Sequence, residues 1–324
     1  GASNLATGLV TATAEGDPVL ALAGQVKRSD LSKLTHQSMN NAALFSPITK
    51  YSTEIQDPET LSENIANAFR IAKTAKKGAS FLSIPQDVTD GQVEGSAIKP
   101  LSAPKLGQAN PEDIEDLVER IKEAKLPVLL LGMRASAESG TEAIRHLIAK
   151  TGLPVVETFQ GAGIISRALE DHFFGRVGLF RNQPGDMLLK RSDLVIAVGY
   201  DPIEYEARNW NAEKDARIIV IDEVPMEIDT YMQPEVELLG SIAKIIEQVT
   251  QVIDQYTLSA DAQNYLATLQ EKLTEKQIEA RGTEQTLHPL EIIDTLQQKV
   301  TDEMTVTVDV GSHYIWMARH FRSY

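Results

Sequence analysis

Four short, wholly apolar segments alternate with helical stretches in the middle of this 324-residue chain, and they constrain its fold more than any other feature. Uninterrupted Val, Ile and Leu indicate strands that are covered on both faces, and strands alternating with helices indicate a parallel sheet. We therefore predict a complete, doubly wound α/β domain at residues 109–256. Its expected strands cover residues 127–132, 153–158, 193–199 and 216–222.

Helices are predicted between these strands and after the last one. Asn110, Pro111, Glu112 and Asp113 form a typical helix start, with an Asn cap, Pro at the first position and acids in the first turn. The helices are expected at residues 110–124, 140–151, 183–191 and 241–256.

The segments on either side have the same α/β character but fewer elements. Residues 1–93 contain a predicted helix at 5–14, a strand at 18–24, a helix at 61–75 and a strand at 80–85. Residues 287–324 contain a helix start and an apolar strand, 306–310, that turns at Gly311 into a helix. Polar residues 94–108 and charged, helical residues 257–286 are predicted linkers. We expect two partial domains flanking a complete one, as in a piece of a larger enzyme.

Composition excludes several classes of protein and partner. The net charge of −15 argues against a nucleic-acid partner, which would need clustered Lys and Arg. No apolar run approaches the roughly 20 residues of a membrane-spanning helix, so no membrane association is expected. The chain has no cysteine and therefore no disulfide or thiolate ligand, which leaves a cytoplasmic location as the default.

Common catalytic motifs such as a Walker A loop or a His-Glu-x-x-His pair are missing. Gly161 and Gly163 resemble a weak dinucleotide fingerprint, and a plain loop is favoured there. The segment 179–186 precedes a helix start where an anion could bind, although a capped turn is favoured.

Polar side chains at strand-to-helix turns are better candidates for a site. His36 and Gln37 follow the first predicted strand; His titrates near neutrality, and Gln both donates and accepts hydrogen bonds. A helix cap with a solvated His explains the spacing equally well. Asn4, Ser312 and His313 occupy similar turns and carry the same two interpretations.

Four segments give the chain a specific resemblance. GASNLATGL at the start, HQSMNN followed by SPITKY, FLSIPQDV, and DVGSHYIWMAR near the end are similar to thiamine-diphosphate-dependent acetolactate synthases, most closely the catabolic type. The resemblance covers essentially the whole chain. It implies a partial pyrimidine-binding domain at 1–93, a central domain at 109–256 and a partial pyrophosphate-binding domain at 287–324.

The resemblance also implies roles for the candidate residues. Gln37 corresponds to a catalytic and substrate-binding glutamine, and His36 to a substrate-binding position where anabolic relatives usually carry Phe. Asn4 lies beside the cofactor's pyrimidine. The turn that approaches the diphosphate comprises Gly311, Ser312 and His313. The family's Glu that drives ylide formation and its Gly-Asp-Gly metal motif are absent, so Mg ligands would lie outside this chain, which alone is expected to be inactive.

The implied activity is condensation of two pyruvate molecules to 2-acetolactate and carbon dioxide through a thiamine diphosphate enamine. Lys76 stands where anabolic relatives place an FAD-contacting Arg, so FAD is not expected to be required. A homodimer or homotetramer is expected, with the cofactor between subunits. The alternatives are a pyruvate-oxidase-like flavin and thiamine enzyme, or a non-catalytic central-domain fragment.

Overall fold

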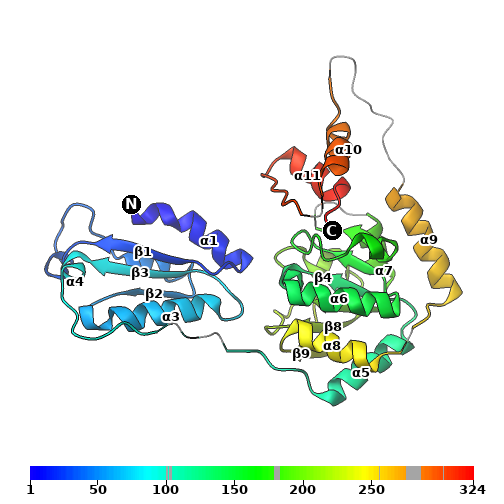
Figure 1. Ribbon diagram of the computed structural model, residues 1–324, viewed down its shortest axis with the longest axis horizontal. Helices are drawn as coiled ribbons and strands as arrows, with labels where there is room; N and C mark the ends of the chain where they lie inside the picture. The colour runs from blue at the N-terminus through cyan, green and yellow to red at the C-terminus, as the bar shows by residue number, and fades with distance from the viewer. Residues whose placement is uncertain (100, 102–103, 179–182, 255, 275–285, 302) are drawn as a thin grey trace. The chain divides into compact units, whose positions relative to one another are not determined.

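The computed structural model describes residues 1–99, 101, 104–178, 183–254, 256–274, 286–301 and 303–324. They form two compact units, Gly1–Lys105 and Leu106–Tyr324, and each is described by itself (Figure 1). The boundary between the units falls inside the predicted linker at 94–108, whereas the assignment of domains remains a prediction.

The first unit has a parallel sheet in the order β1-β3-β2, with β1 at Leu20–Gln25, β2 at Tyr51–Glu54 and β3 at Ser80–Pro85. Because side chains alternate across a strand, the sheet buries apolar residues on both faces. Phe81 packs on one face against α1 (Ala6–Glu15) and α2 (Asn41–Phe45), while Leu82 packs on the other against α3 (Leu61–Lys73). Two short helices complete the unit, the 3-10 helix Ala2–Leu5 and α4 at Gln86–Thr89.

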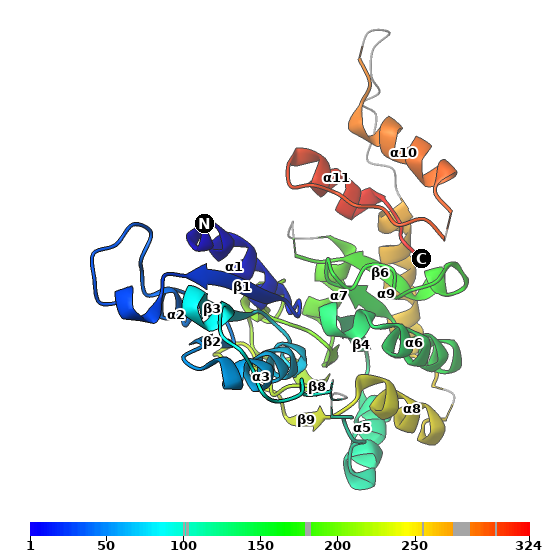
Figure 2. The ribbon, with the colours of Figure 1, turned by 60° about the vertical axis from the view of Figure 1, so that its left-hand side comes forward.

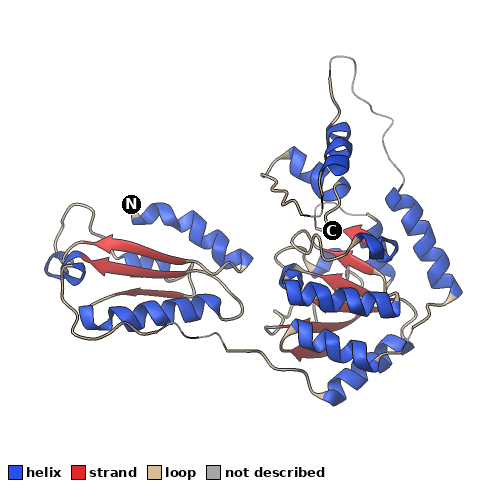
Figure 3. Ribbon diagram, in the orientation of Figure 1, coloured by secondary structure: helices blue, strands red, loops and turns tan. Residues whose placement is uncertain are grey.

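The second unit contains a six-stranded sheet in which every pair of neighbouring strands is parallel (Figure 3). The order is β6-β5-β4-β7-β8-β9, so the chain starts in the middle of the sheet and winds outward in both directions. This confirms the predicted doubly wound α/β fold. The strands are β4 Pro127–Leu131, β5 Val155–Glu157, β6 Phe173–Arg176, β7 Leu194–Val198, β8 Arg217–Asp222 and β9 Val236–Leu239.

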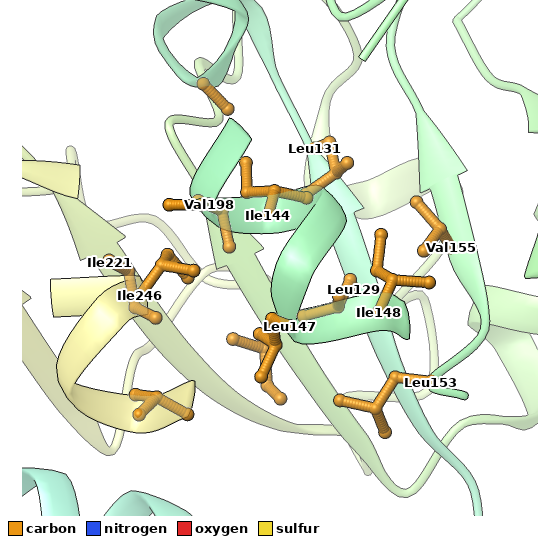
Figure 4. Packing of buried hydrophobic residues seen from close by; sticks show 14 of the residues in the cluster. Leu129, Leu131, Ile144, Leu147, Ile148, Leu153, Val155, Val198, Ile221 and Ile246 are labelled. Carbon is orange, nitrogen blue, oxygen red and sulfur yellow. The ribbon is translucent and has the colours of Figure 1, made fainter. Parts of the chain in front are cut away.

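Helices cover both faces of this sheet. On one face α5 (Pro111–Glu123), α6 (Glu138–Thr151) and α8 (Ile242–Val252) bury their apolar stripes, and Figure 4 shows α6 packing Ile144, Leu147 and Ile148 onto the strands. On the other face lie α7 (Pro184–Arg191) and α9 (Ala260–Thr274). The start of α7 has a local cause, because Gln183 and Asp186 form a capping box.

Two elements differ from the sequence-based expectations. The predicted strand at 306–310 is not a strand: its residues are exposed, Val310 by 85%, because no described strand lies beside it to pair its backbone. The segment 257–286 was predicted as a linker, but its described part includes α9, which buries Leu266 and Leu269 against the central sheet. Residues 275–285 lie outside the described residues.

The last part of the second unit is a helix pair, α10 (Pro289–Lys299) and α11 (Ser312–His320). Leu290, Ile293 and Phe321 form a small core of their own. Figure 2 shows α11 near β6, in agreement with the contacts between these two elements.

Candidate functional site

The carboxyl edge of the first unit's sheet holds a polar network built on Gln25, the last residue of β1. Gln25 is 8% exposed; its Nε2 donates to the carbonyl oxygen of Met39 at 2.7 Å and to Oε2 of Glu54 at 3.1 Å. Glu54, the last residue of β2, also accepts from Ser83 Oγ at 3.1 Å and from Gln56 Nε2 at 3.0 Å. Parallel strands end at this edge, where α/β sheets bind ligands.

His36 and Gln37 lie on the loop that leaves this edge. Both side chains are exposed. The backbone of Gln37 has φ +62°, a left-handed conformation uncommon for a residue with a side chain, within a turn in which the Ser38 N–H donates to the carbonyl of Thr35 at 3.4 Å. Asn40 then caps α2 by accepting the N–H of Ala43 at 3.0 Å. The loop therefore presents both predicted site residues outward.

Asn4 lies in the 3-10 helix Ala2–Leu5, and its side chain is exposed. This helix contacts both β1 and α2. The structure thus places the three predicted site residues of the first unit, Asn4, His36 and Gln37, on elements that meet around the end of β1.

Gly311, Ser312 and His313 belong to the second unit, at the start of α11. Gly311 has φ +155°, a backbone conformation that residues with a side chain rarely adopt, so the turn favours glycine. The N-cap residue Gly311 has no side chain with which to cap α11, and all three residues are exposed. Free N–H groups at an exposed helix start fit an anionic group such as a diphosphate.

Sequence reasoning missed a cluster at the point where the central sheet switches winding direction. Arg134, after β4, donates from Nε and Nη2 to the two oxygens of Asp222 at 2.8 and 2.7 Å, and from Nη1 to Asp201 at 2.7 Å. Asp222 is fully buried. Burial lowers the pKa of Arg134, but hydrogen bonds and charge from the two carboxylates outweigh it, so the net pKa is raised. The sequence signal that could have revealed this cluster is Asp222, a charged residue at the end of an apolar run.

The loops around this cluster are closely packed. A Cβ at Gly132 would lie 2.4 Å from Cα of Tyr200, and one at Gly199 would lie 2.3 Å from the backbone N of Ala135. Glu204 fills the neighbouring space, where its carboxylate accepts from Met133 N, Thr158 Oγ1 and Gln160 N. Side chains of the protein itself therefore fill the crevice at the carboxyl edge of this central sheet, where ligands usually bind.

Gly161 and Gly163, the weak fingerprint, lie in a loop. Arg145 donates to the carbonyls of Gly163 and Ile164 at 2.9 and 2.7 Å. No helix begins at the loop's third glycine position, where Ser166 precedes a 3-10 turn, so the favoured loop interpretation fits. Of the candidate segment 179–186, residues 179–182 lie outside the described residues.

A buried ion pair joins β5 and β6 to α11. Oε2 of Glu157 lies 3.6 Å from Nε of Arg176, whose Nη1 donates to the carbonyls of Phe321 at 3.0 Å and Ala318 at 3.4 Å. Burial raises the pKa of Glu157 to about 7, against the opposing charges of Arg176 and Arg322.

Two further contacts hold the same helix. Arg322 pairs with both oxygens of Glu170 at 2.9 and 3.0 Å, and the ring of Tyr314 stacks on Phe159 with centroids 5.1 Å apart. The turn at Gly311 is therefore carried by a helix that is fixed to the central sheet at both ends.

The described residues contain no group of three or more His, Cys, Asp or Glu side chains arranged to hold a metal ion. Within the same ranges no helix is long and apolar enough to cross a membrane.

Comparison with known proteins adds to this geometry. Residues 114–249 match the family model described as thiamine pyrophosphate enzyme, central domain. Over its whole length the chain is 49% identical to an acetolactate synthase of Bacillus subtilis (strain 168) and 40% identical to a catabolic acetolactate synthase of Raoultella terrigena. A probable acetolactate synthase large subunit of Methanocaldococcus jannaschii is 28% identical. The chain spans 57%, 58% and 56% of these relatives' lengths. The matches confirm the resemblance predicted from the motifs.

Proposed function

We propose that this chain, whose residues 114–249 are a thiamine pyrophosphate enzyme central domain, belongs to a catabolic acetolactate synthase. The observation that carries the proposal is the 49% and 40% identity to acetolactate synthases along the entire chain, including both predicted cofactor-binding segments. In this proposal residues 1–93 are part of a pyrimidine-binding domain and residues 287–324 part of a pyrophosphate-binding domain. The whole protein would condense two pyruvate molecules to 2-acetolactate and carbon dioxide.

The described residues have separate tasks in this reaction. Gly311, Ser312 and His313 would hold the cofactor's diphosphate, because their exposed, uncapped helix start offers N–H donors. Asn4 would contact the pyrimidine, while His36 and Gln37 would orient pyruvate through hydrogen bonds to its carboxylate or carbonyl. Thiamine diphosphate, when bound, supplies the nucleophilic carbon that amino-acid side chains lack. Mg²⁺ would bind the diphosphate through ligands outside this chain.

The proposal includes no requirement for FAD. Two observations support this: Lys76 replaces the expected Arg, and Arg134 with its two carboxylates occupies the crevice of the central sheet. We further propose a cytoplasmic homodimer or homotetramer, with the cofactor held between the first domain of one subunit and the third domain of another.

The test uses the full-length protein with thiamine diphosphate, Mg²⁺ and pyruvate. We expect 2-acetolactate and carbon dioxide in a ratio of one to one, no flavin absorbance, and no activity from this chain alone. Stoichiometric flavin with pyruvate oxidation would favour the pyruvate-oxidase alternative. A full-length protein that binds no thiamine diphosphate would favour the non-catalytic one.

Substrate preference tests the assignment of His36. In the full-length enzyme His36→Phe removes a polar group from the pocket, so we expect a changed preference between pyruvate and 2-oxobutyrate as acceptor. One methylene in a pocket is worth roughly 1–3 kcal/mol, or about tenfold to hundredfold in product ratio. An unchanged ratio in competition assays would remove His36 from the site.

A further inference from the structure

One side chain, Gln25, closes the loop that carries His36 and Gln37. Its Oε1 accepts the N–H of Val26 at 3.0 Å, at the start of the loop, and its Nε2 donates to the carbonyl of Met39 at 2.7 Å, at the end. Both ends of the loop are therefore hydrogen-bonded to the same side-chain amide, that of Gln25.

Glu54 fixes the orientation of that amide. Its Oε2 accepts the second Nε2 hydrogen of Gln25 at 3.1 Å and the hydroxyl hydrogen of Ser83 at 3.1 Å. This acceptor, together with the Met39 carbonyl and the Val26 N–H, keeps the amide nitrogen of Gln25 turned toward Glu54 and its oxygen turned toward Val26. All three strands of the sheet contribute, since Gln25, Glu54 and Ser83 come from β1, β2 and β3.

A separate ion pair holds the first residues of the loop. Arg28 donates from its backbone N and its Nε to the two oxygens of Asp87, at 2.9 and 2.7 Å, and a further nitrogen donates to the carbonyl of Gln56. The pair of Arg28 and Asp87 fixes the start of the loop, whereas Gln25 fixes its end at Met39. The free span between these anchors contains His36 and the left-handed Gln37.

We propose that Gln25, oriented by Glu54, is a positioning residue for pyruvate: it fixes the loop that presents His36 and Gln37. The inference rests on the proposed acetolactate synthase function and adds residues that the motifs did not mark. It does not place Gln25 in contact with substrate. Gln25 acts on the loop through its hydrogen bond to the Met39 carbonyl. Its replacement should therefore change the KM for pyruvate more than the stability of the sheet.

The decisive variant is Gln25→Glu in the full-length enzyme, with Gln92→Glu as the matched control. Glu at position 25 faces the carboxylate of Glu54 and, when ionised, cannot donate to Met39. As the pH falls the two neighbouring carboxyls take up protons, and a protonated Glu at position 25 can again donate to the Met39 carbonyl. Gln92 is exposed in the same unit and undergoes the same chemical change.

We measure kcat and KM for pyruvate between pH 6 and pH 8.5, relative to the wild type at each pH. For Gln25→Glu we expect a KM about tenfold higher at pH 8, a recovery toward wild type at pH 6, and a melting temperature close to that of Gln92→Glu. A merely structural role would lower the melting temperature and kcat together, with a ratio to wild type that does not depend on pH.

Gln25→Met keeps the test valid if Gln25→Glu fails to fold. Met has similar length but no donor, so KM should rise without any recovery at low pH. Wild-type KM in either folded variant, or a pH-independent loss in Gln25→Glu, overturns the proposal. A wild-type enzyme that makes no 2-acetolactate instead defeats the proposed function, so the two failures are distinguishable.

Discussion

At the scale of single residues, Gln37 combines backbone strain with an exposed polar side chain. A side-chain-bearing residue at φ +62° costs roughly 1–3 kcal/mol, which glycine would avoid. Burial does not compensate, because the side chain is exposed. A strained and exposed position of this kind fits the proposed contact of the amide to pyruvate.

Gln37→Asn tests the role of the amide while keeping the fold of the loop. Asn tolerates the left-handed conformation, so the loop should keep its shape while the amide is one methylene shorter. In the full-length enzyme we expect kcat/KM for pyruvate to fall about tenfold to hundredfold, as when a hydrogen bond to a charged group is lost. The melting temperature should not change. Full activity would show that the side chain does not reach the substrate.

Glu157 illustrates the cost of burying a carboxyl beside an imperfect partner. Among the described residues, no donor bonds Oε2 of Glu157, and no acceptor bonds Nε or Nη2 of Arg176. Because burial raises its pKa from 4.5 to about 7, the folded state holds the proton more tightly than the unfolded state does. The corresponding stability is present below about pH 4.5 and is lost as the pH rises through 7.

Glu157→Gln should flatten this pH dependence. We expect the wild-type free energy of unfolding of the second unit to decrease by up to about 3 kcal/mol between pH 4.5 and pH 7 on account of Glu157, and the variant to lack that decrease. Urea unfolding can be followed by the buried Trp210 in a Trp316→Phe background, since the chain has two tryptophans. Parallel pH curves for the two proteins would contradict the assignment.

At the scale of elements, strands within continuous apolar runs could be predicted, and strands without such a run could not. β7 and β8 were found because both of their faces are covered, as were β3 and β4. β2, with sequence YSTE, and β6, with FFGR, have no continuous apolar pattern, so they were missed. The terminal run 306–310 was predicted as a strand because apolar alternation reports a tendency to pair and not the presence of a partner.

The candidate site likewise contains residues that could be predicted from the sequence and residues that could not. Its exposed residues stand in contiguous motifs, so the sequence marked Gln37 and Gly311. The residues that support the site are joined only by the fold: Glu54 lies 29 positions from Gln25, and Asp222 lies 88 positions from Arg134. No local pattern records such pairs.

The element α9 shows how packing overrode a prediction made from charge. Its outer face is charged, but Leu269 is fully buried, the Tyr265 hydroxyl donates to the Met187 carbonyl at 2.9 Å, and Gln270 donates to the Phe173 carbonyl at 2.9 Å. These contacts make the helix part of the central domain's second face.

Leu269→Ala should therefore destabilise the second unit by about 2–5 kcal/mol, as for other buried leucines. The exposed Thr268→Ala on the same helix is the control and should have little effect. Denaturant titration of both variants measures the difference. Equal stability of the two variants would indicate that α9 is a linker, as predicted from the sequence, and that its packing does not stabilise the second unit.

At the scale of the whole molecule, the two units are joined by chain that lies outside both sheets. Described residues between α4 and α5 form neither helix nor strand, and most are exposed, including Leu101 at 69%. Exposed segments without backbone pairing are the first sites of proteolysis. The connection, and not either sheet, should therefore be the point at which the chain is opened.

Trypsin gives this expectation a specific position. Lys99 precedes Pro100, which blocks cleavage after it, whereas Lys105 is exposed and precedes Leu106. We expect the first cut after Lys105 to release the unit Gly1–Lys105, before any cut at Lys150 in α6 or Arg191 in α7, because cutting within a packed helix requires local unfolding. Mass spectrometry of a digestion time course identifies the products, and Lys105→Gln should delay separation of the units. Earlier cleavage inside α6 or α7 would mean that the central sheet opens before the connection does, and the two-unit description would be wrong.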